Sequence, residues 1–197
     1  EGMTYKLNFS KNNKNINNQK MKQNLMESDT DHIIYSSSDY NNLIDSGKGV
    51  YRYTNLNDTN IYFSGNIQRL VQNYRIGFIR LAQEELLSKN NNKNKEAEKI
   101  INLMNKYFPE KRLPIEPGIA LLVADSIYAK TGNIEKQKQI LYTLFEDQIP
   151  IETKIYLLHK FADLDFQKET LDIASQLIEE NNKQLDFELQ KYLGDIL

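Results

Sequence analysis

The sequence has no cysteine and no tryptophan, only 2 histidines, and only 8 glycines and 4 prolines among its 197 residues. Without cysteine, the chain forms no disulfide bond and offers no thiolate to a metal ion. The formal net charge is -2, because 25 basic residues nearly balance 27 acidic ones. A nucleic-acid-binding domain carries a clear excess of basic residues. We therefore expect no nucleic-acid partner.

Long apolar runs are absent as well, and no stretch reaches the roughly 18 apolar residues that a membrane-spanning helix needs. Residues Glu1-Gly2-Met3 are neither an initiator methionine nor the basic start of a secretory signal, which we interpret as the start of a mature or excised fragment. Hydrophobic residues make up 40% of the chain and charged residues 26%. This composition is typical of a folded globular chain.

Motifs of enzymes and metal sites are also absent from the sequence. Neither His32 nor His159 belongs to a paired-histidine motif, and there is no glycine-rich phosphate loop or GxSxG elbow. Asp29-Thr30-Asp31 and Asp163-Leu164-Asp165 each pair two carboxylates, but a metal site needs further converging oxygen ligands. We interpret them as loop and helix-end residues. The sequence predicts a chain that is not an enzyme and has no cofactor or metal site.

Residues 1–64 predict an irregular N-terminal segment with short strands. Met3–Phe9 alternates apolar and polar residues, as a half-buried strand does. Ser10–Lys22 is rich in Asn and Lys, so we expect a mobile loop. We expect this segment to pack on the helical part. An alternative is that it caps the first hydrophobic face of that part.

The second half of that segment contains shorter elements. Ser37 or Ser38 is a good N-cap for a brief helix that Gly47 would end. Val50–Tyr53 and Ile61–Phe63 predict strands or extended segments on either side of an Asn/Asp-rich turn at Asn55–Asn60.

Residues 65–197 predict a helical domain. Asn66 is a suitable N-cap for a helix that runs to about Leu87. Gly77 inside it predicts close approach of a neighbouring helix, since glycine costs a helix about 1 kcal/mol relative to alanine. Apolar residues recur every three or four positions and define its buried stripe: Ile67, Leu70, Val71, Tyr74, Phe78, Leu81 and Ala82.

The remaining helices are predicted from the same spacing. Apolar stripes occur in Ala97–Met104, Ile119–Tyr128, Ile134–Leu144, Ile151–Leu164, Phe166–Glu179 and Leu185–Leu197. Thr131-Gly132-Asn133 predicts a tight interhelical turn, and Tyr107-Phe108-Pro109 predicts a helix stop.

Parts of this pattern resemble tetratricopeptide repeats. Ala97, Ile101, Met104 and Pro109 have the spacing of the second helix of such a repeat, and Tyr128 with Gly132-Asn133 matches the next unit. Gln137 at a small-residue position and a late Pro150 are departures. The predicted fold class is mainly α, an α-solenoid of tetratricopeptide-like helical hairpins with a small irregular or β N-terminal segment.

A stack of helical hairpins exposes a concave groove lined mainly by the first helix of each pair. The predicted partner-binding residues on that groove are Asn73, Arg75, Arg80 and Lys130. They offer polar contacts to a protein, a peptide or a glycan acceptor. The alternative is that they form a plain solvated face.

Two blocks, Glu1–Leu7 (EGMTYKL) and Tyr51–Gln83, resemble a family of large bacterial multi-pass membrane proteins of unknown function. In its C-terminal region an EGLAYRL-like segment precedes a (N/D)LDDPDVYYDEN-like segment, an SNYRxxFARLA-like helix and tetratricopeptide-like repeats. This chain reads NLNDTNIYF at Asn55–Phe63, so Thr59 replaces the family's proline, and QNYRIGFIRLA at Gln72–Ala82. The membrane part of that family is similar to protein O-mannosyltransferases of the GT-C class.

The resemblance implies a domain on the extracytoplasmic (periplasmic) face of a bacterial inner membrane, attached to a glycosyltransferase-like membrane part that this chain lacks. We therefore expect a non-catalytic accessory domain that binds a protein partner or positions an acceptor. The alternative is a carbohydrate- or lipid-carrier-binding module that uses the aromatic rings of Tyr51, Tyr53 and Tyr62.

Overall fold

The computed structural model describes residues 18–26, 38, 41–42, 51, 53, 56, 58, 60–146, 149–164 and 166–180. These residues are mainly helical and contain no strand. The predicted strand Met3–Phe9 and the predicted helix Leu185–Leu197 lie outside them. The elements are α1 (Asn18–Met26), α3 (Gly65–Leu86), α4 (Lys93–Tyr107), α5 (Pro117–Val123), the π-helical turn η1 (Ala124–Tyr128), α6 (Ala129–Thr131), α7 (Ile134–Glu146), α8 (Ile151–Asp163) and α9 (Gln167–Glu180).

Contacts divide the chain into two compact units, Glu1–Gly132 and Asn133–Leu197, whereas the sequence predicts a division between residues 64 and 65. Helix α1 and the described residues before α3 belong to the same unit as α3 to α6. Each unit is described separately below. None of the helices in the described ranges is long and apolar enough to cross a membrane.

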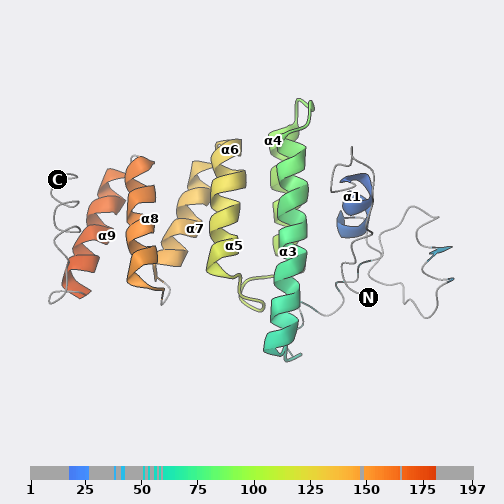
Figure 1. Cartoon of the computed structure of the whole chain (residues 1–197), viewed down its shortest axis with the longest axis horizontal. Coiled ribbons are helices and arrows are strands. Elements are labelled where there is room, and N and C mark those ends of the chain that lie inside the picture. The colour runs from blue at the N-terminus through green and yellow to red at the C-terminus, as the bar shows by residue number, and fades with distance from the viewer. Residues whose placement is uncertain are drawn as a thin grey trace, which may run out of the picture. The chain divides into compact units, whose positions relative to one another are not determined.

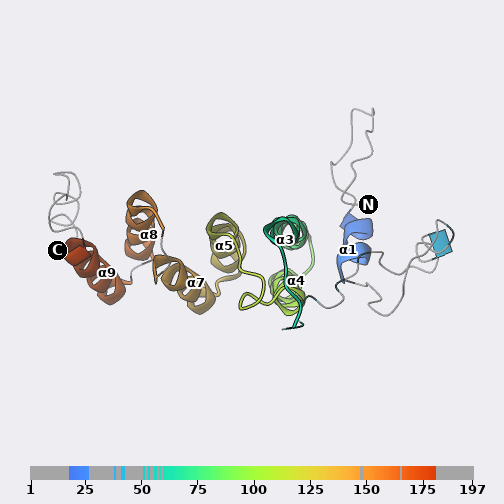
Figure 2. The ribbon, with the colours of Figure 1, turned by 90° about the horizontal axis from the view of Figure 1, so that it is seen from below.

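The first unit is built on the hairpin of α3 and α4, which lie side by side (Figure 2). The predicted stripe of α4 is confirmed, because Ala97, Ile100, Ile101 and Met104 are buried. Phe108 ends that helix as predicted and is itself fully buried. Helix α3 has 22 residues and α4 has 15, so the hairpin partner does not cover the whole length of α3.

The start of α3 differs from the prediction in two respects. The N-cap is Ser64 rather than Asn66, because the helix begins at Gly65. Ile67 and Leu70 are 40% and 55% exposed, although the predicted stripe buries them. Further along the helix the stripe is buried at Val71, Phe78, Leu81 and Ala82 and half-buried at Tyr74. Ile67 and Leu70 are exposed because the first two turns of α3 lie beyond the segments that pack on the rest of this helix.

Helix α1 packs against the middle of α3 (Figure 2). A Cβ atom at Gly77 would lie 3.5 Å from Leu25 and 3.9 Å from Met21, so the predicted close approach of a helix at Gly77 is confirmed. Asn18 Nδ2 also donates a hydrogen bond to Glu84 Oε2 at 3.0 Å. The predicted loop Ser10–Lys22 is therefore wrong from Asn18 onward. Burial of Leu25 and partial burial of Met21 against α3 stabilise a helix that the polar sequence does not favour alone.

Described residues before α3 supply aromatic side chains to the core. Tyr53 is buried, stacks on Tyr107 with 4.3 Å between ring centroids, and donates a hydrogen bond to the Leu25 carbonyl at 3.3 Å. The predicted turn at Asn55–Asn60 is present in its described part, where the Asn60 N–H donates to the Asp58 side chain at 2.8 Å. The described residues between 51 and 63 form no strand.

Helices α5 and α6 form one continuous rod through η1, with Ile119, Val123, Ile127 and Tyr128 buried as predicted. Leu122 differs from the prediction, since 40% of its surface is exposed. Gly132 ends the rod with φ of 76°, a left-handed conformation that glycine adopts without a steric penalty.

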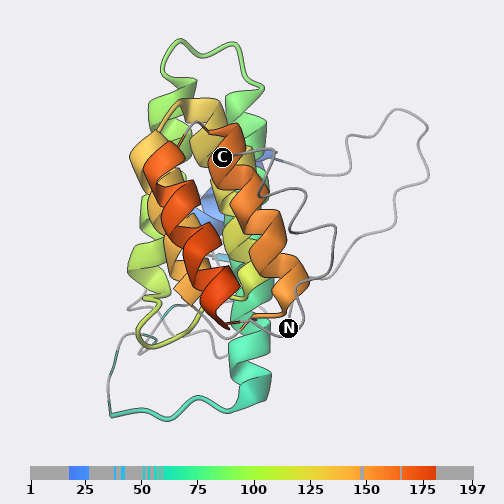
Figure 3. The ribbon, with the colours of Figure 1, turned by 90° about the vertical axis from the view of Figure 1, so that its left-hand side faces the viewer.

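The second unit contains α7, α8 and α9. Helix α9 runs alongside α8, red beside orange in Figure 3. The core of the second unit contains predicted positions together with Phe145, Leu157 and Ile173, which the prediction omitted: Leu141, Leu144, Phe145, Leu157, Leu158, Phe161, Ile173, Ala174 and Leu177. Lys138 of α7 forms an ion pair with Glu169 of α9 and lies over the Phe166 ring. The pKa of Lys138 is raised by this hydrogen bond, and that of Glu169 is lowered.

Candidate functional site

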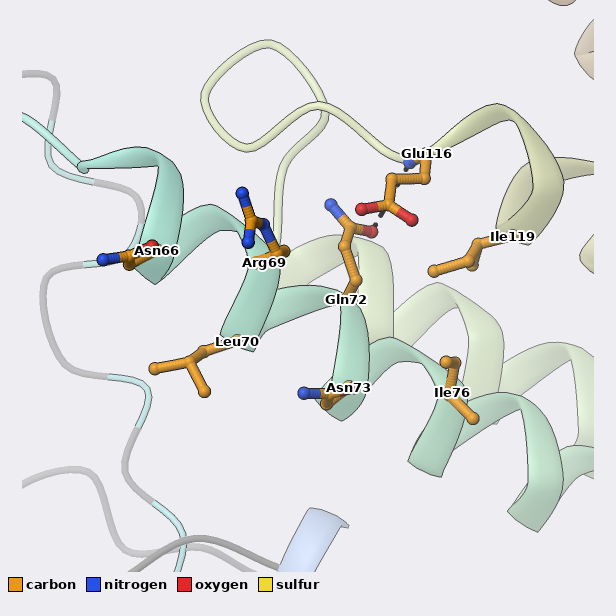
Figure 4. A pocket seen from close by; sticks show the side chains of 8 residues that line it. All are labelled: Asn66, Arg69, Leu70, Gln72, Asn73, Ile76, Glu116 and Ile119. Atoms are coloured by element: carbon orange, nitrogen blue, oxygen red, sulfur yellow. Dashed lines mark hydrogen bonds between the residues drawn. The ribbon is translucent and has the colours of Figure 1, made fainter.

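An open groove lies between the first half of α3 and the start of α5 (Figure 4). Its volume is about 630 Å³. Its walls combine apolar and polar side chains: Asn66, Arg69, Leu70, Gln72, Asn73, Ile76, Glu116 and Ile119. We call this the α3/α5 groove. The exposed Leu70 side chain and the buried Ile119 provide apolar surface, while Arg69, Asn73 and Glu116 are exposed polar groups.

The upper wall of the groove is fixed by buried polar side chains of α3. Gln72 Nε2 donates a hydrogen bond to the Pro114 carbonyl at 2.8 Å, and Gln72 Oε1 accepts one from the Glu116 N–H at 3.5 Å. Arg75 Nη1 also donates to the Pro114 carbonyl at 2.8 Å, and to Gln72 Oε1 at 3.1 Å. These bonds tie the segment between α4 and α5 to α3. The groove is therefore preformed by the fold.

Arg75 is the largest fully buried side chain of the described residues, and its guanidinium donates hydrogen bonds to backbone carbonyls. Besides Pro114, it donates to the carbonyls of Phe108, at 2.9 Å, and Leu113. Burial lowers the pKa of Arg75 to about 10, an effect that Glu110 partly offsets, so the group remains charged at neutral pH. The three carbonyls accept charge-assisted hydrogen bonds, which are stronger than neutral ones.

A second arginine fixes the same segment from the other side. Arg112 Nε donates to the Asp58 carbonyl at 3.0 Å, and its guanidinium carbon lies 5.2 Å from the centroid of the Phe63 ring. Arg75 and Arg112 together hold residues 108–116 between α3 and the residues that precede it. This double attachment holds the segment that leads into α5, whose start forms one wall of the groove.

The four predicted partner-binding residues lie in different environments. Asn73 lines the groove. Arg80 is exposed on the same side of α3, one turn beyond Ile76. Lys130 is exposed on α6 and does not line the groove. The prediction for Arg75 is wrong, because its side chain is 0% exposed and donates its hydrogen bonds to Gln72 and to the carbonyls of Phe108, Leu113 and Pro114.

The three tyrosines of the alternative function do not form a platform. Tyr53 is 5% exposed, and Tyr51 packs edge-on against Tyr74 with ring centroids 5.2 Å apart. Tyr62 is 86% exposed and stands apart from this cluster. The carbohydrate-binding alternative requires exposed rings around a cleft. Tyr53 is buried and Tyr51 is half-buried, so Tyr62 is the one exposed ring of the three.

The prediction missed Arg69, Ile76 and Glu116 as groove residues. Arg69, Asn73, Ile76 and Arg80 are spaced by four, three and four residues, which places them on one stripe of a helix. This spacing was a signal in the sequence. Glu116 has no such signal, because a loop brings it to α3. Among the described residues no three His, Asp or Glu side chains form a group that could hold a metal ion.

Comparisons with known protein families, curated proteins and solved structures give no match. Function is therefore inferred from the groove and from the sequence.

Proposed function

We propose that this chain is a non-catalytic protein-interaction module that binds a segment of a partner protein in the α3/α5 groove. The observation that carries the proposal is the combination of an exposed apolar side chain, Leu70, with exposed polar side chains on two elements that Arg75 holds together. Exposed apolar surface with a polar rim is typical of protein interaction sites. A preformed groove avoids the entropic cost of ordering its walls when the partner binds.

The proposal includes a repeat architecture. We propose that α3 to α9 form a short solenoid of tetratricopeptide-like hairpins. The α3/α4 pair, the buried Ala97, Ile101 and Met104, and the left-handed turn at Gly132 support it. Solenoids of this kind bind partners along the first helices of their repeats, and the groove lies on such a helix.

The location rests on the family resemblance alone. We propose that the module belongs to the extracytoplasmic side of a membrane glycosyltransferase-like protein, where it binds another subunit or positions an acceptor protein. The gene sequence that precedes Glu1 tests this directly. Several long apolar segments encoded there are expected, and a reading frame without them contradicts the membrane origin.

The binding role is tested by photocrosslinking in the cells that produce the protein. A photoreactive amino acid replaces Leu70 or Asn73 in the groove. The matched control replaces Leu87, which is 77% exposed on the turn after α3. Discrete covalent adducts with another protein are expected from the groove positions and not from position 87. Equal labelling at all three positions, or none at the groove, contradicts the proposal.

A further inference from the structure

We propose that the segment bound in the α3/α5 groove is acidic, with carboxylates on either side of an apolar side chain that enters the groove. This inference deepens the proposed function and rests on it. It follows from two positive charges along α3, from the apolar surface that lies between these charges, and from the distance between the two charges.

Two arginines mark the ends of one stripe of α3. Arg69 and Arg80 are both exposed, and neither forms a hydrogen bond or ion pair with any described residue. Arg80 lies eleven positions after Arg69, which is about 16 Å at the rise of roughly 1.5 Å per residue in an α-helix. Arginine binds a carboxylate through two parallel hydrogen bonds, so each end of the stripe is a docking point for Asp or Glu.

The middle of the stripe offers different chemistry. Asn73 and Ile76 lie between the two arginines, and Leu70 and Ile119 are further apolar side chains that line the groove (Figure 4). The Asn73 amide has a donor and an acceptor, which together can pair with one peptide group of an extended chain. An apolar side chain of the partner would cover Leu70, which is 55% exposed.

These distances fit an extended segment. At about 3.3 Å per residue, roughly five residues span the 16 Å between the arginines. The partner therefore carries two acidic residues about five positions apart and one large apolar residue between them. A helical partner would need about eleven residues for the same span, with its apolar side chain near the middle.

Glu116 fixes the side on which the acidic groups lie. Its exposed side chain stands on the groove wall formed by the start of α5, opposite the stripe of α3 (Figure 4). A carboxylate of the partner is repelled there and attracted along α3. The groove thus discriminates against a uniformly anionic ligand such as a nucleic acid.

The test is a selection from a randomised 12-residue peptide library on the full chain, followed by fluorescence anisotropy with the enriched peptides. Enriched sequences are expected to carry acidic residues around an apolar one. The double variant Arg69→Glu, Arg80→Glu should weaken their binding at least about tenfold at low salt. Glu116→Gln should strengthen it. The matched control Lys106→Glu changes an exposed cation of α4 outside the groove and should have no effect.

Other outcomes separate this inference from the proposed function. Enriched peptides without acidic residues, whose binding is nevertheless lost in Leu70→Ser, overturn the acidic partner and leave the groove as a binding site. Peptides that bind equally well to every groove variant, or no enrichment at all, overturn both. Dimerisation that Leu70→Ser abolishes identifies a second copy as the occupant. If the double variant Asp29→Asn, Asp31→Asn binds peptides more tightly, then acidic residues of the chain itself compete with the peptide for the groove. Either result overturns the inference.

Discussion

Arg75 Nη1 donates a 2.8 Å hydrogen bond to the carbonyl oxygen of Pro114, 39 residues further along the chain. This bond joins the middle of α3 to the loop that leads into α5. Because Arg75 is fully buried, the loop is held by a charge that water cannot screen. The groove beside it depends on this attachment, although Arg75 itself does not line the groove.

We predict that Arg75→Ala lowers the free energy of unfolding by about 3 kcal/mol or more. The substitution leaves the carbonyls of Phe108, Leu113 and Pro114 without their charged donor in a buried site. Chemical denaturation monitored by circular dichroism measures the change. The control is Arg80→Ala, which removes an exposed arginine of the same helix. Its free energy of unfolding should stay within about 0.5 kcal/mol of that of the parent protein. Similar losses for both variants would refute a special role for Arg75.

The packing of α1 on α3 predicts opposite effects for two substitutions of Gly77. A Cβ atom there meets Leu25 at an ordinary contact distance of 3.5 Å, so Gly77→Ala should stabilise the protein, by at most about 1 kcal/mol. Gly77→Leu has no space and should displace α1. Hydrogen exchange of residues 18–26 then accelerates, while that of α4 stays slow. Unchanged protection of α1 in Gly77→Leu would show that it packs elsewhere.

The turn after α6 predicts a contrast between two glycines. Gly132 has φ of 76°, so Gly132→Ala places a residue with a Cβ atom in the left-handed backbone region. This substitution should lower the free energy of unfolding by about 1 kcal/mol or more. Gly132→Asn should cost less, because Asn tolerates this conformation. Gly118 lies in the first turn of α5 with open space around its Cα, and Gly118→Ala should be neutral or stabilising. Thermal melting of the three variants checks the order.

Alkaline pH should unfold the protein through its buried tyrosines. Burial raises the pKa of Tyr128 to about 12, with smaller contributions from Glu98 and Glu110, and burial also raises the pKa of Tyr53 well above its usual value. The folded state then holds these protons more tightly than the unfolded state. Stability is therefore fully present below about pH 10 and falls between about pH 10 and 12.

Tyrosinate absorbance and circular dichroism, recorded together during an alkaline titration, test this expectation. Part of the signal from the 12 tyrosines should appear in one step with the loss of helix. Tyr128→Phe should reduce the step and shift it to higher pH. Full ionisation of all tyrosines while the helical signal is intact would contradict the burial of both rings.

Local sequence patterns determined much of the secondary structure of the described residues. The spacing of Ala97, Ile101 and Met104 determined which side of α4 is buried, and Gly132 determined where α6 ends, because both depend on local periodicity and backbone conformation. Gly77 likewise indicated a neighbouring helix. The sequence did not indicate that this neighbour is α1, whose polar composition favours a loop.

Only the tertiary structure decided the roles of Arg75 and Leu70. By sequence, Arg75 reads as a surface cation and Leu70 as a core residue, yet Arg75 is fully buried and Leu70 is more than half exposed. The physical reason is that burial depends on what covers a side chain. The loop of residues 108–116 folds over Arg75 and supplies carbonyls to it, while the first turns of α3 extend past their neighbours. Helical periodicity places residues on a face, but only the path of the rest of the chain determines which face meets the core.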